Sequence, residues 1–178
     1  MKRQALQYCV PVLLDAAEAL SSAFARGNKL LVCGNGGSAA DSQHIATEFV
    51  CRLSGDFERP ALPAIALTTD SSILTAIGND YTFERIFARQ VEALGRKGDV
   101  LLAISTSGNS EVVVEAVRAA KSQGMITIGL LGRDGGKLAP LTDYPIVVPS
   151  ESTQHVQESQ IALYHILVGI VERTVFPQ

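Results

Sequence analysis

Two short turns carry most of the sequence's chemical character. The first, Gly34-Asn35-Gly36-Gly37-Ser38, has three glycines, which permit tight turns and the close approach of a ligand. The second, Ser105-Thr106-Ser107-Gly108-Asn109-Ser110, places four hydroxyl groups around one glycine. Each turn precedes a predicted helix, so its free N–H groups and hydroxyls can bind a phosphate without lysine or arginine. The alternative for the second turn is an ordinary helix start with Ser110 as its N-cap.

Four further side chains could hold a metal ion or move protons. His44 and Glu48 stand four residues apart in a predicted helix and therefore share one face. Gln157 and His165 stand eight apart in the last predicted helix, about 80° past two full turns, so both can lean toward one region. Two imidazoles, a carboxylate and an amide oxygen suit a divalent metal of the zinc type. Spacing alone also permits a simple surface or capping contact between His44 and Glu48.

Apolar runs between these positions predict the elements that must hold them. The runs are rich in Val, Ile and Leu and nearly continuous, which favours parallel strands covered by helices on both faces. We expect five strands, at residues 29–33, 63–67, 99–105, 127–131 and 144–148. Helical spacing predicts helices over residues 39–53, 71–94 and 110–123, the second of them broken near Asn79 and Asp80.

Long amphipathic helices are expected at both ends, over residues 4–25 and 157–172. The first of them is expected to place six residues on a shared apolar face: Leu6, Val10, Leu13, Leu14, Ala17 and Leu20. The pattern predicts one α/β domain over residues 1–178, with an N-terminal helix in 1–28, a β-α core in 29–150 and a C-terminal helix in 151–178. Ligands of such sheets bind at the carboxyl ends of the strands, where both turns are expected to lie.

Composition narrows the classes of partner. The 15 Lys and Arg against 18 Asp and Glu give a net charge of −3, so we expect no nucleic-acid partner. The longest continuous apolar runs fall short of the roughly 20 residues that a membrane span needs, and the N-terminus lacks an apolar signal segment. These features predict a cytoplasmic protein without a membrane partner. Three cysteines without CxxC spacing indicate neither a disulfide framework nor a cysteine zinc site.

Taken together, the two turns resemble those of the sugar isomerase (SIS) family of phosphosugar-binding domains. Longer matches at residues 33–44, 105–110 and 135–138, with Gln157-Glu158 near the end, are similar to the phosphoheptose isomerases within that family. The similarity extends over nearly the whole chain. It implies a single SIS-type domain and an aldose-ketose isomerase that converts sedoheptulose 7-phosphate into D-glycero-D-manno-heptose 7-phosphate through an enediol. That product leads toward the heptose of bacterial lipopolysaccharide.

The resemblance also implies roles for individual residues. The phosphate would be held by Ser105, Thr106, Ser107 and Ser110, and the sugar by Asn35, Gly37, Ser38, Glu48, Asn79, Asp80 and Gln157. One Zn²⁺ per active site would be bound by His44, Glu48, Gln157 and His165, with Glu48 and His165 as the catalytic acid-base pair. For Asp80, an ordinary turn aspartate is an equally good interpretation. Family members are homotetramers with active sites between subunits, and compared with them this sequence is expected to lack one N-terminal helix.

Two other functions remain open at this point. One is a non-catalytic relative that binds the bacterial replication initiator; such proteins share the fold but typically lack the catalytic Glu and the final His. The other is a phosphosugar sensor, which needs the phosphate turn but not the acid-base pair. The presence of Glu48 and His165 favours the enzyme.

Overall fold

The computed structural model describes residues 2–177, with side chains from Gln7 onward. Within this range lies a five-stranded, all-parallel sheet with the strand order β2-β1-β3-β4-β5. The strands are β1 (Leu30–Cys33), β2 (Ala64–Ala66), β3 (Val100–Ser105), β4 (Ile126–Gly132) and β5 (Tyr144–Val148). Each lies within one residue of its predicted bounds. Residues 1 and 178, the ends of the predicted domain, lie outside the described residues.

The helices follow the predicted order with shifted ends. They are α1 (Lys2–Ala25), α2 (Gly37–Val50), α3 (Ser71–Asp80), the short 3-10 helix η1 (Phe83–Arg85), α4 (Ala88–Leu94), α5 (Glu111–Ser122) and α6 (Thr153–Val175). The break predicted near Asn79 is confirmed, because α3 ends at Asp80. Helix α6 begins four residues earlier than expected, since the hydroxyl of Ser152 accepts a capping hydrogen bond from the backbone N–H of His155 at 3.4 Å.

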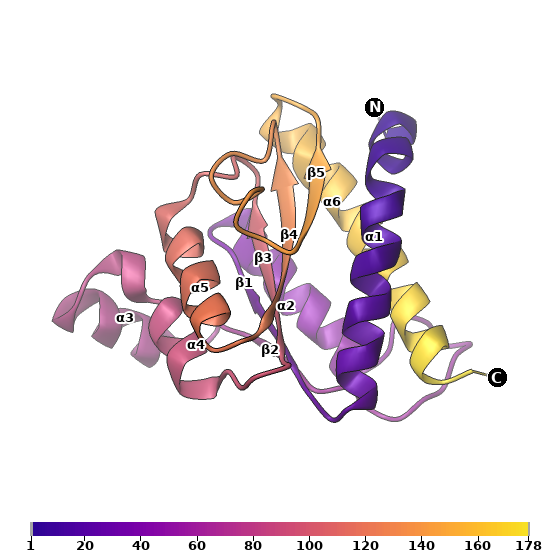
Figure 1. Cartoon of the computed structure of the whole chain (residues 1–178), viewed down its shortest axis with the longest axis horizontal. Helices are drawn as coiled ribbons and strands as arrows, with labels where there is room; N and C mark the ends of the chain where they lie inside the picture. Colours follow the sequence, from indigo (N-terminus) through magenta and orange to yellow (C-terminus); the bar gives the residue numbers. More distant parts are fainter. Residues whose placement is uncertain (1, 178) are drawn as a thin grey trace.

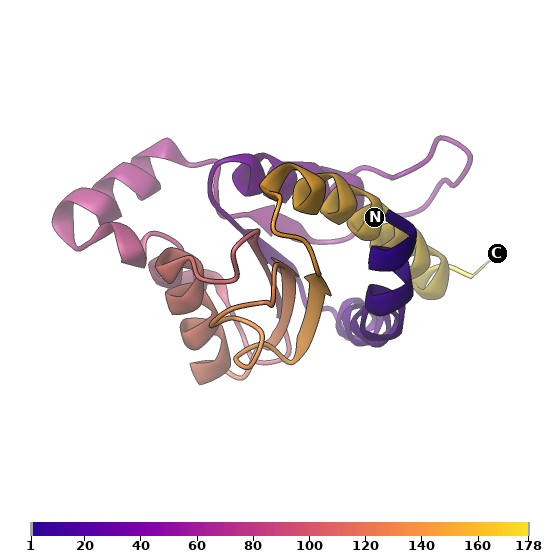
Figure 2. The same cartoon turned by 90° about the horizontal axis from the view of Figure 1, so that it is seen from above.

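Helices cover both faces of the sheet, as predicted. Helices α1, α2 and α6 pack on one face and α4 and α5 on the other, while α3 projects from the body (Figures 1 and 2). Alternate strand residues serve the two faces: Leu30 and Leu102 belong to the apolar cluster under α1 and α6, and Leu31 and Leu101 to the cluster under α4 and α5. Burial on both faces explains why the central strands β1, β3 and β4 read as continuous apolar runs, whereas the edge strands β2 and β5 are only partly buried.

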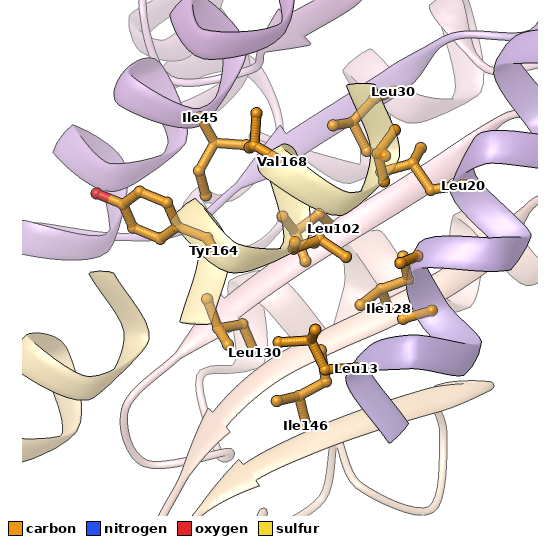
Figure 3. Packing of buried hydrophobic residues seen from close by; sticks show 14 of the residues in the cluster. Leu13, Leu20, Leu30, Ile45, Leu102, Ile128, Leu130, Ile146, Tyr164 and Val168 are labelled. Atoms are coloured by element: carbon orange, nitrogen blue, oxygen red, sulfur yellow. The ribbon is translucent and has the colours of Figure 1, made fainter. Parts of the chain in front are cut away.

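The larger cluster joins the two terminal helices to the sheet. Figure 3 shows Leu13 and Leu20 of α1 and Val168 of α6 against Leu102 and Ile128 of the sheet. Full burial of a leucine or isoleucine contributes roughly 1.5–3 kcal/mol, so this layer fixes α6 firmly on the sheet. Its position matters because α6 carries two of the predicted site residues.

The expected apolar face of α1 is partly wrong. Leu13 and Leu20 are buried, but Val10 and Leu14 are 37% and 49% exposed. Ala17 is buried as expected, and the side chain of Leu6 lies outside the described residues. The buried stripe runs through Cys9, Leu13, Ala16 and Ala17, at spacings of three and four residues, and Val10 and Leu14 lie on its flank. Periodicity allowed both arrangements, and contact with α6 and β5 selected one of them.

Helix α1 contains an apolar segment that is longer than any continuous apolar run in the sequence. Residues 7–25 form a 19-residue stretch with a mean hydropathy of 1.3, enough by length and composition to cross a membrane. A core helix of a globular protein meets the same criterion. The packing of α1 against α6 and β5 is of that kind.

Candidate functional site

The strand order creates a crevice where the two chemically unusual turns lie. The chain leaves β1 for β2 on one side of it, and the later strands β3, β4 and β5 are added on the other side. Connections therefore diverge at the carboxyl ends of β1 and β3, which is where open α/β sheets bind their ligands. The turns leaving these two neighbouring strands are the ones singled out by their glycines and hydroxyls.

A polar pocket of about 120 Å³, which we call the serine pocket, lies between these turns. Its volume is roughly that of four water molecules. The amide nitrogen of Asn35 donates a hydrogen bond of 2.9 Å to the hydroxyl of Ser110, which joins the two turns across the pocket mouth. Apart from Ile104, the lining consists of residues expected to bind substrate. It comprises Asn35, Ser38, Ile104, Ser105, Thr106, Ser107 and Ser110.

Ser110 occupies the N-cap position of α5 without using its hydroxyl to cap the helix. Within the described residues its side chain makes no capping hydrogen bond and accepts from Asn35 instead. The first N–H groups of α5 therefore lack the side-chain acceptor that an ordinary capped helix would have. This arrangement favours the binding interpretation of the turn over the purely structural one.

The segment after β4 contacts residues 105–110, which we call the serine turn. Gly108 has a φ of +66°, and a Cβ at this position would overlap the backbone carbonyl of Gly135. The N–H of Leu138 donates to the carbonyl of Gly108 at 3.0 Å, and that of Lys137 to the side-chain carbonyl of Asn109 at 3.1 Å. Residues 135–138, for which the resemblance implied no role, thus hold the serine turn in its conformation.

Gln157 lies against residues 34–38, which we call the glycine turn. A Cβ at Gly37 would overlap the side-chain amide nitrogen of Gln157, so a larger residue here would displace the end of that side chain. Gln157 is half-buried and precedes His165 by eight residues, or about 12 Å along the axis of α6. Helix α6 therefore extends from the glycine turn to the position of His165.

His44, Glu48 and His165 come together from α2 and α6. The Nε2 atom of His44 is 2.8 Å from the Oε1 atom of Glu48 and 3.4 Å from the Nε2 atom of His165, and the three ligand atoms lie within 4.8 Å of one another. Ligands of a tetrahedral zinc, each about 2.0–2.1 Å from the ion, stand about 3.3–3.5 Å apart. The three side chains are therefore spaced to hold a small divalent cation with little movement.

Two residues that sequence reasoning missed lie behind His44. The phenol oxygen of Tyr164 is 3.0 Å from the Nδ1 atom of His44 and 3.5 Å from the Oδ1 atom of Asp41. Burial, and then the neighbouring Asp41 carboxylate, raise the pKa of Tyr164 well above its ordinary value, so the phenol keeps its proton. Burial also raises the pKa of Asp41, although Tyr164 and His44 act in the opposite direction. Asp41 precedes His44 by three residues, the only sequence signal that could have found it.

Five predicted substrate contacts do not line the serine pocket, namely Gly37, Glu48, Asn79, Asp80 and Gln157. Of these, Asn79 and Asp80 lie on a different part of the fold. They end the projecting helix α3, are exposed, and share a hydrogen bond of 2.8 Å between the Asn79 amide and the Asp80 carboxylate. Asp80 instead lines a separate pocket of about 270 Å³ between α3 and α4, with Tyr81 and Arg89. Within this single chain the two residues thus stand apart from the other candidates.

Comparisons with known proteins bear on the family and the fold of the chain. The sequence model of the SIS domain family matches residues 8–132. The chain is 54% identical over 178 residues to a phosphoheptose isomerase of Roseiflexus sp. (strain RS-1), an alignment that covers 100% of this chain and 89% of that protein.

Solved structures give the same result. The structure of phosphoheptose isomerase GmhA from Neisseria gonorrhoeae matches with a TM-score of 0.89 and 47% identity, over 96% of this chain and 90% of that one. A phosphoheptose isomerase from Francisella tularensis matches with a TM-score of 0.92 and 39% identity, over 97% and 91% of the two chains. The five-stranded parallel sheet with helices on both faces is therefore the fold of these relatives.

Proposed function

This chain belongs to the SIS domain family, and from that premise we propose that it is a phosphoheptose isomerase, an aldose-ketose isomerase acting on sedoheptulose 7-phosphate. The observation that carries the proposal is that Glu48 of α2 and His165 of α6 lie together. Helix α2 begins at the serine pocket, which is lined by its residue Ser38. His44 follows Ser38 by six residues, or about 9 Å of helix, and an open-chain sugar phosphate bridges such a distance.

The phosphate binds in the serine pocket. Ser105, Thr106, Ser107 and Ser110 offer hydroxyl donors, and the first turn of α5 adds N–H groups and the positive end of its dipole. Asn35, Gly37 and Ser38 contact the sugar hydroxyls from the facing turn. Binding energy from the distant phosphate orients the reacting carbons, which is how a remote group contributes to rate.

Glu48 and His165 move the protons. Sedoheptulose 7-phosphate has its carbonyl at C2, and isomerisation takes a proton from C1 while a proton is added to the C2 oxygen, giving an enediol. The proton then returns to C2 as the C1 oxygen loses its own, and an aldehyde forms at C1 with no external oxidant. One member of the pair transfers the proton between the carbon atoms, and the other transfers the protons of the oxygen atoms. The product is D-glycero-D-manno-heptose 7-phosphate.

The donor set fits zinc, one ion per active site. His44, Glu48 and His165 supply two imidazoles and a carboxylate at suitable spacing. Gln157 is the fourth ligand that the resemblance to the family implies. Bound there, zinc supplies a Lewis acid that polarises the substrate carbonyl. The exposure of His44, whose side chain is 45% accessible, leaves the site open to substrate.

The active enzyme is a cytoplasmic homotetramer with sites between subunits. Helix α3 supports this assignment, because it buries none of its residues against the described part of the chain. Its Asn79 and Asp80 carry polar groups away from their own serine pocket, and assembly brings them to the pocket of another subunit. The product would enter lipopolysaccharide heptose synthesis.

The two alternatives are less favoured. A protein that only binds the replication initiator, or only senses a phosphosugar, has no need of an acid-base pair in one cluster. Here Glu48 and His165 are held together from separate helices.

The test is direct conversion of substrate. Purified protein is mixed with sedoheptulose 7-phosphate, with and without a chelator, and aldose formation is followed by NMR. We expect turnover that the chelator abolishes and zinc restores. Glu48→Gln should abolish turnover without changing the fold, whereas the control Glu18→Gln, on the exposed side of α1, should not. Full turnover by Glu48→Gln would remove Glu48 from the mechanism, and no aldose from the wild-type protein would reject the function.

A further inference from the structure

Tyr164 combines a core position with a polar contact to the cation site. Its side chain is 1% exposed and lies in the apolar cluster with Ile45 and Val168 (Figure 3). Figure 3 shows its phenol oxygen pointing out of this cluster. That oxygen contacts His44 at 3.0 Å, and the next residue along α6 is His165. One turn of α6 therefore supplies a site residue and a support for another.

The hydrogen bonds around His44 can be satisfied in two ways. A neutral imidazole carries one proton, on Nδ1 or on Nε2. With the proton on Nε2, His44 donates to Glu48 and its Nδ1 accepts from Tyr164. With Nε2 turned to a cation, the proton must be on Nδ1. It then donates to the phenol oxygen of Tyr164, whose own hydrogen turns to Asp41 at 3.5 Å.

The second arrangement forms an unbroken chain from carboxylate to phenol to imidazole. Metal-binding histidines usually donate their other N–H to such a partner, which fixes the tautomer and the ring orientation. Asp41 stands three residues before His44 on the same face of α2, and Tyr164 reaches both from α6. No other titratable side chain is within hydrogen-bond distance of His44 Nδ1 among the described residues.

We infer that Tyr164 and Asp41 are positioning residues for His44. Tyr164 holds the Nδ1–H tautomer, so that Nε2 faces the cation shared with Glu48 and His165, and Asp41 acts through Tyr164. The inference rests on the proposed function in taking that cation to be zinc, and it assigns neither residue to the chemistry of the sugar.

The experiment measures zinc affinity without substrate. Zn²⁺ is titrated into the metal-free protein in competition with a chromophoric chelator. Tyr164→Phe keeps the ring and removes one hydroxyl, and we expect zinc to bind about 10- to 100-fold more weakly. The matched control is Tyr144→Phe, a partly buried tyrosine packed on the same apolar cluster, which should leave the affinity unchanged. Equal affinity for wild type and Tyr164→Phe, or an equal loss in Tyr144→Phe, would overturn the inference.

Two further readouts separate positioning from a general loss of structure. If Asp41 acts through Tyr164, Asp41→Asn weakens zinc binding in the wild-type background but causes no further loss of affinity in Tyr164→Phe. Additive losses of affinity contradict the hydrogen-bond chain from Asp41 through Tyr164 to His44. Nitrogen-15 NMR of the zinc-loaded wild-type protein should show a protected Nδ1–H on His44, which is lost in Tyr164→Phe. A His44 protonated at Nε2 in that state would also refute the inference.

The result is separable from the proposed function. If the wild-type protein fails to isomerise sedoheptulose 7-phosphate but Tyr164→Phe still weakens zinc binding, the function is rejected and the inference stands. If turnover occurs and zinc affinity does not depend on Tyr164, the function stands and the inference is rejected. A wild-type protein that binds no zinc overturns the inference.

Discussion

A buried ion pair at the far end of the site's two helices gives the sharpest stability prediction. The Nε atom of Arg59 is 3.2 Å from the Oε2 atom of Glu172, and both side chains are 0% exposed. Arg59 also donates to the backbone carbonyls of Glu48 at 2.7 Å, Phe49 at 2.9 Å and Pro60 at 3.0 Å. The guanidinium thus ties the end of α2 to α6. The perturbation is Glu172→Gln, which keeps the shape and removes the charge.

The expected cost follows from the burial. Removing one partner of a buried pair leaves an uncompensated charge and costs about 3–5 kcal/mol. Glutamine still offers one acceptor to Arg59, so we expect the lower end, about 3 kcal/mol. For a chain of this length each kcal/mol lowers Tm by about 2–4 °C, which gives a fall of about 6–12 °C. Because Glu172 Oε1 has no hydrogen-bond partner within residues 7–177, the native pair is itself imperfect.

The assay is thermal and urea unfolding of the metal-free protein at fixed concentration. The exposed pair of Arg85 and Glu92, 2.6 Å apart, provides the control, and Glu92→Gln should cost less than about 1 kcal/mol. Replacing both buried partners, as Arg59→Met with Glu172→Leu, removes the uncompensated charge but also takes a donor from the backbone carbonyls of Glu48, Phe49 and Pro60, so we expect it to recover only part of the lost stability. If Glu172→Gln costs no more than Glu92→Gln, this reasoning is wrong.

Two further predictions concern the pocket and the pH dependence of stability. Ser107→Ala should weaken binding of sedoheptulose 7-phosphate by about 1–3 kcal/mol, or roughly 5- to 150-fold, measured by calorimetry beside the control Ser122→Ala; unchanged affinity would place the phosphate elsewhere. Burial raises the pKa of Asp143, but hydrogen bonds from Lys121 and Thr127 outweigh this, and the net pKa lies below its ordinary value. The stability it contributes is present above the unfolded pKa of about 4 and is lost as pH falls through the folded pKa. The penalty of Asp143→Asn in urea unfolding should therefore be larger at pH 7 than at pH 3, and an equal penalty at both would contradict the assignment.

Local sequence patterns predicted the secondary structure well because they reflect local physics. A strand buried on both faces must be apolar throughout, which is why β1, β3 and β4 could be placed from their composition. The edge strands β2 and β5 are apolar as well, although they are only partly buried. Helix ends were less accurate. Gly37 already belongs to α2 and Thr153 to α6, since a turn glycine and a capped polar segment can both enter a helix without any change in apolar periodicity.

Patterns also identified candidate residues without arranging them. The i, i+4 spacing brings His44 next to Glu48 in any helix, and the hydroxyls of residues 105–110 indicate an anion site wherever the turn lies. The strand order decided that this turn would face residues 34–38 across one pocket. Packing of α6 on α2 decided that His165 would reach His44. Distances of this kind depend on contacts between distant segments, which periodicity does not record.

The sequence by itself determined the strands, the polar turns and the donor types, because each depends on residues close together in the chain. Only the tertiary structure decided that Tyr164 would turn its hydroxyl toward His44, that Arg59 would find Glu172 across 113 residues, and that Asp80 would stand on a projecting helix. A core tyrosine, a loop arginine and a helix glutamate look ordinary in sequence. Their roles arise only when folding buries their polar atoms next to partners that are distant in the sequence.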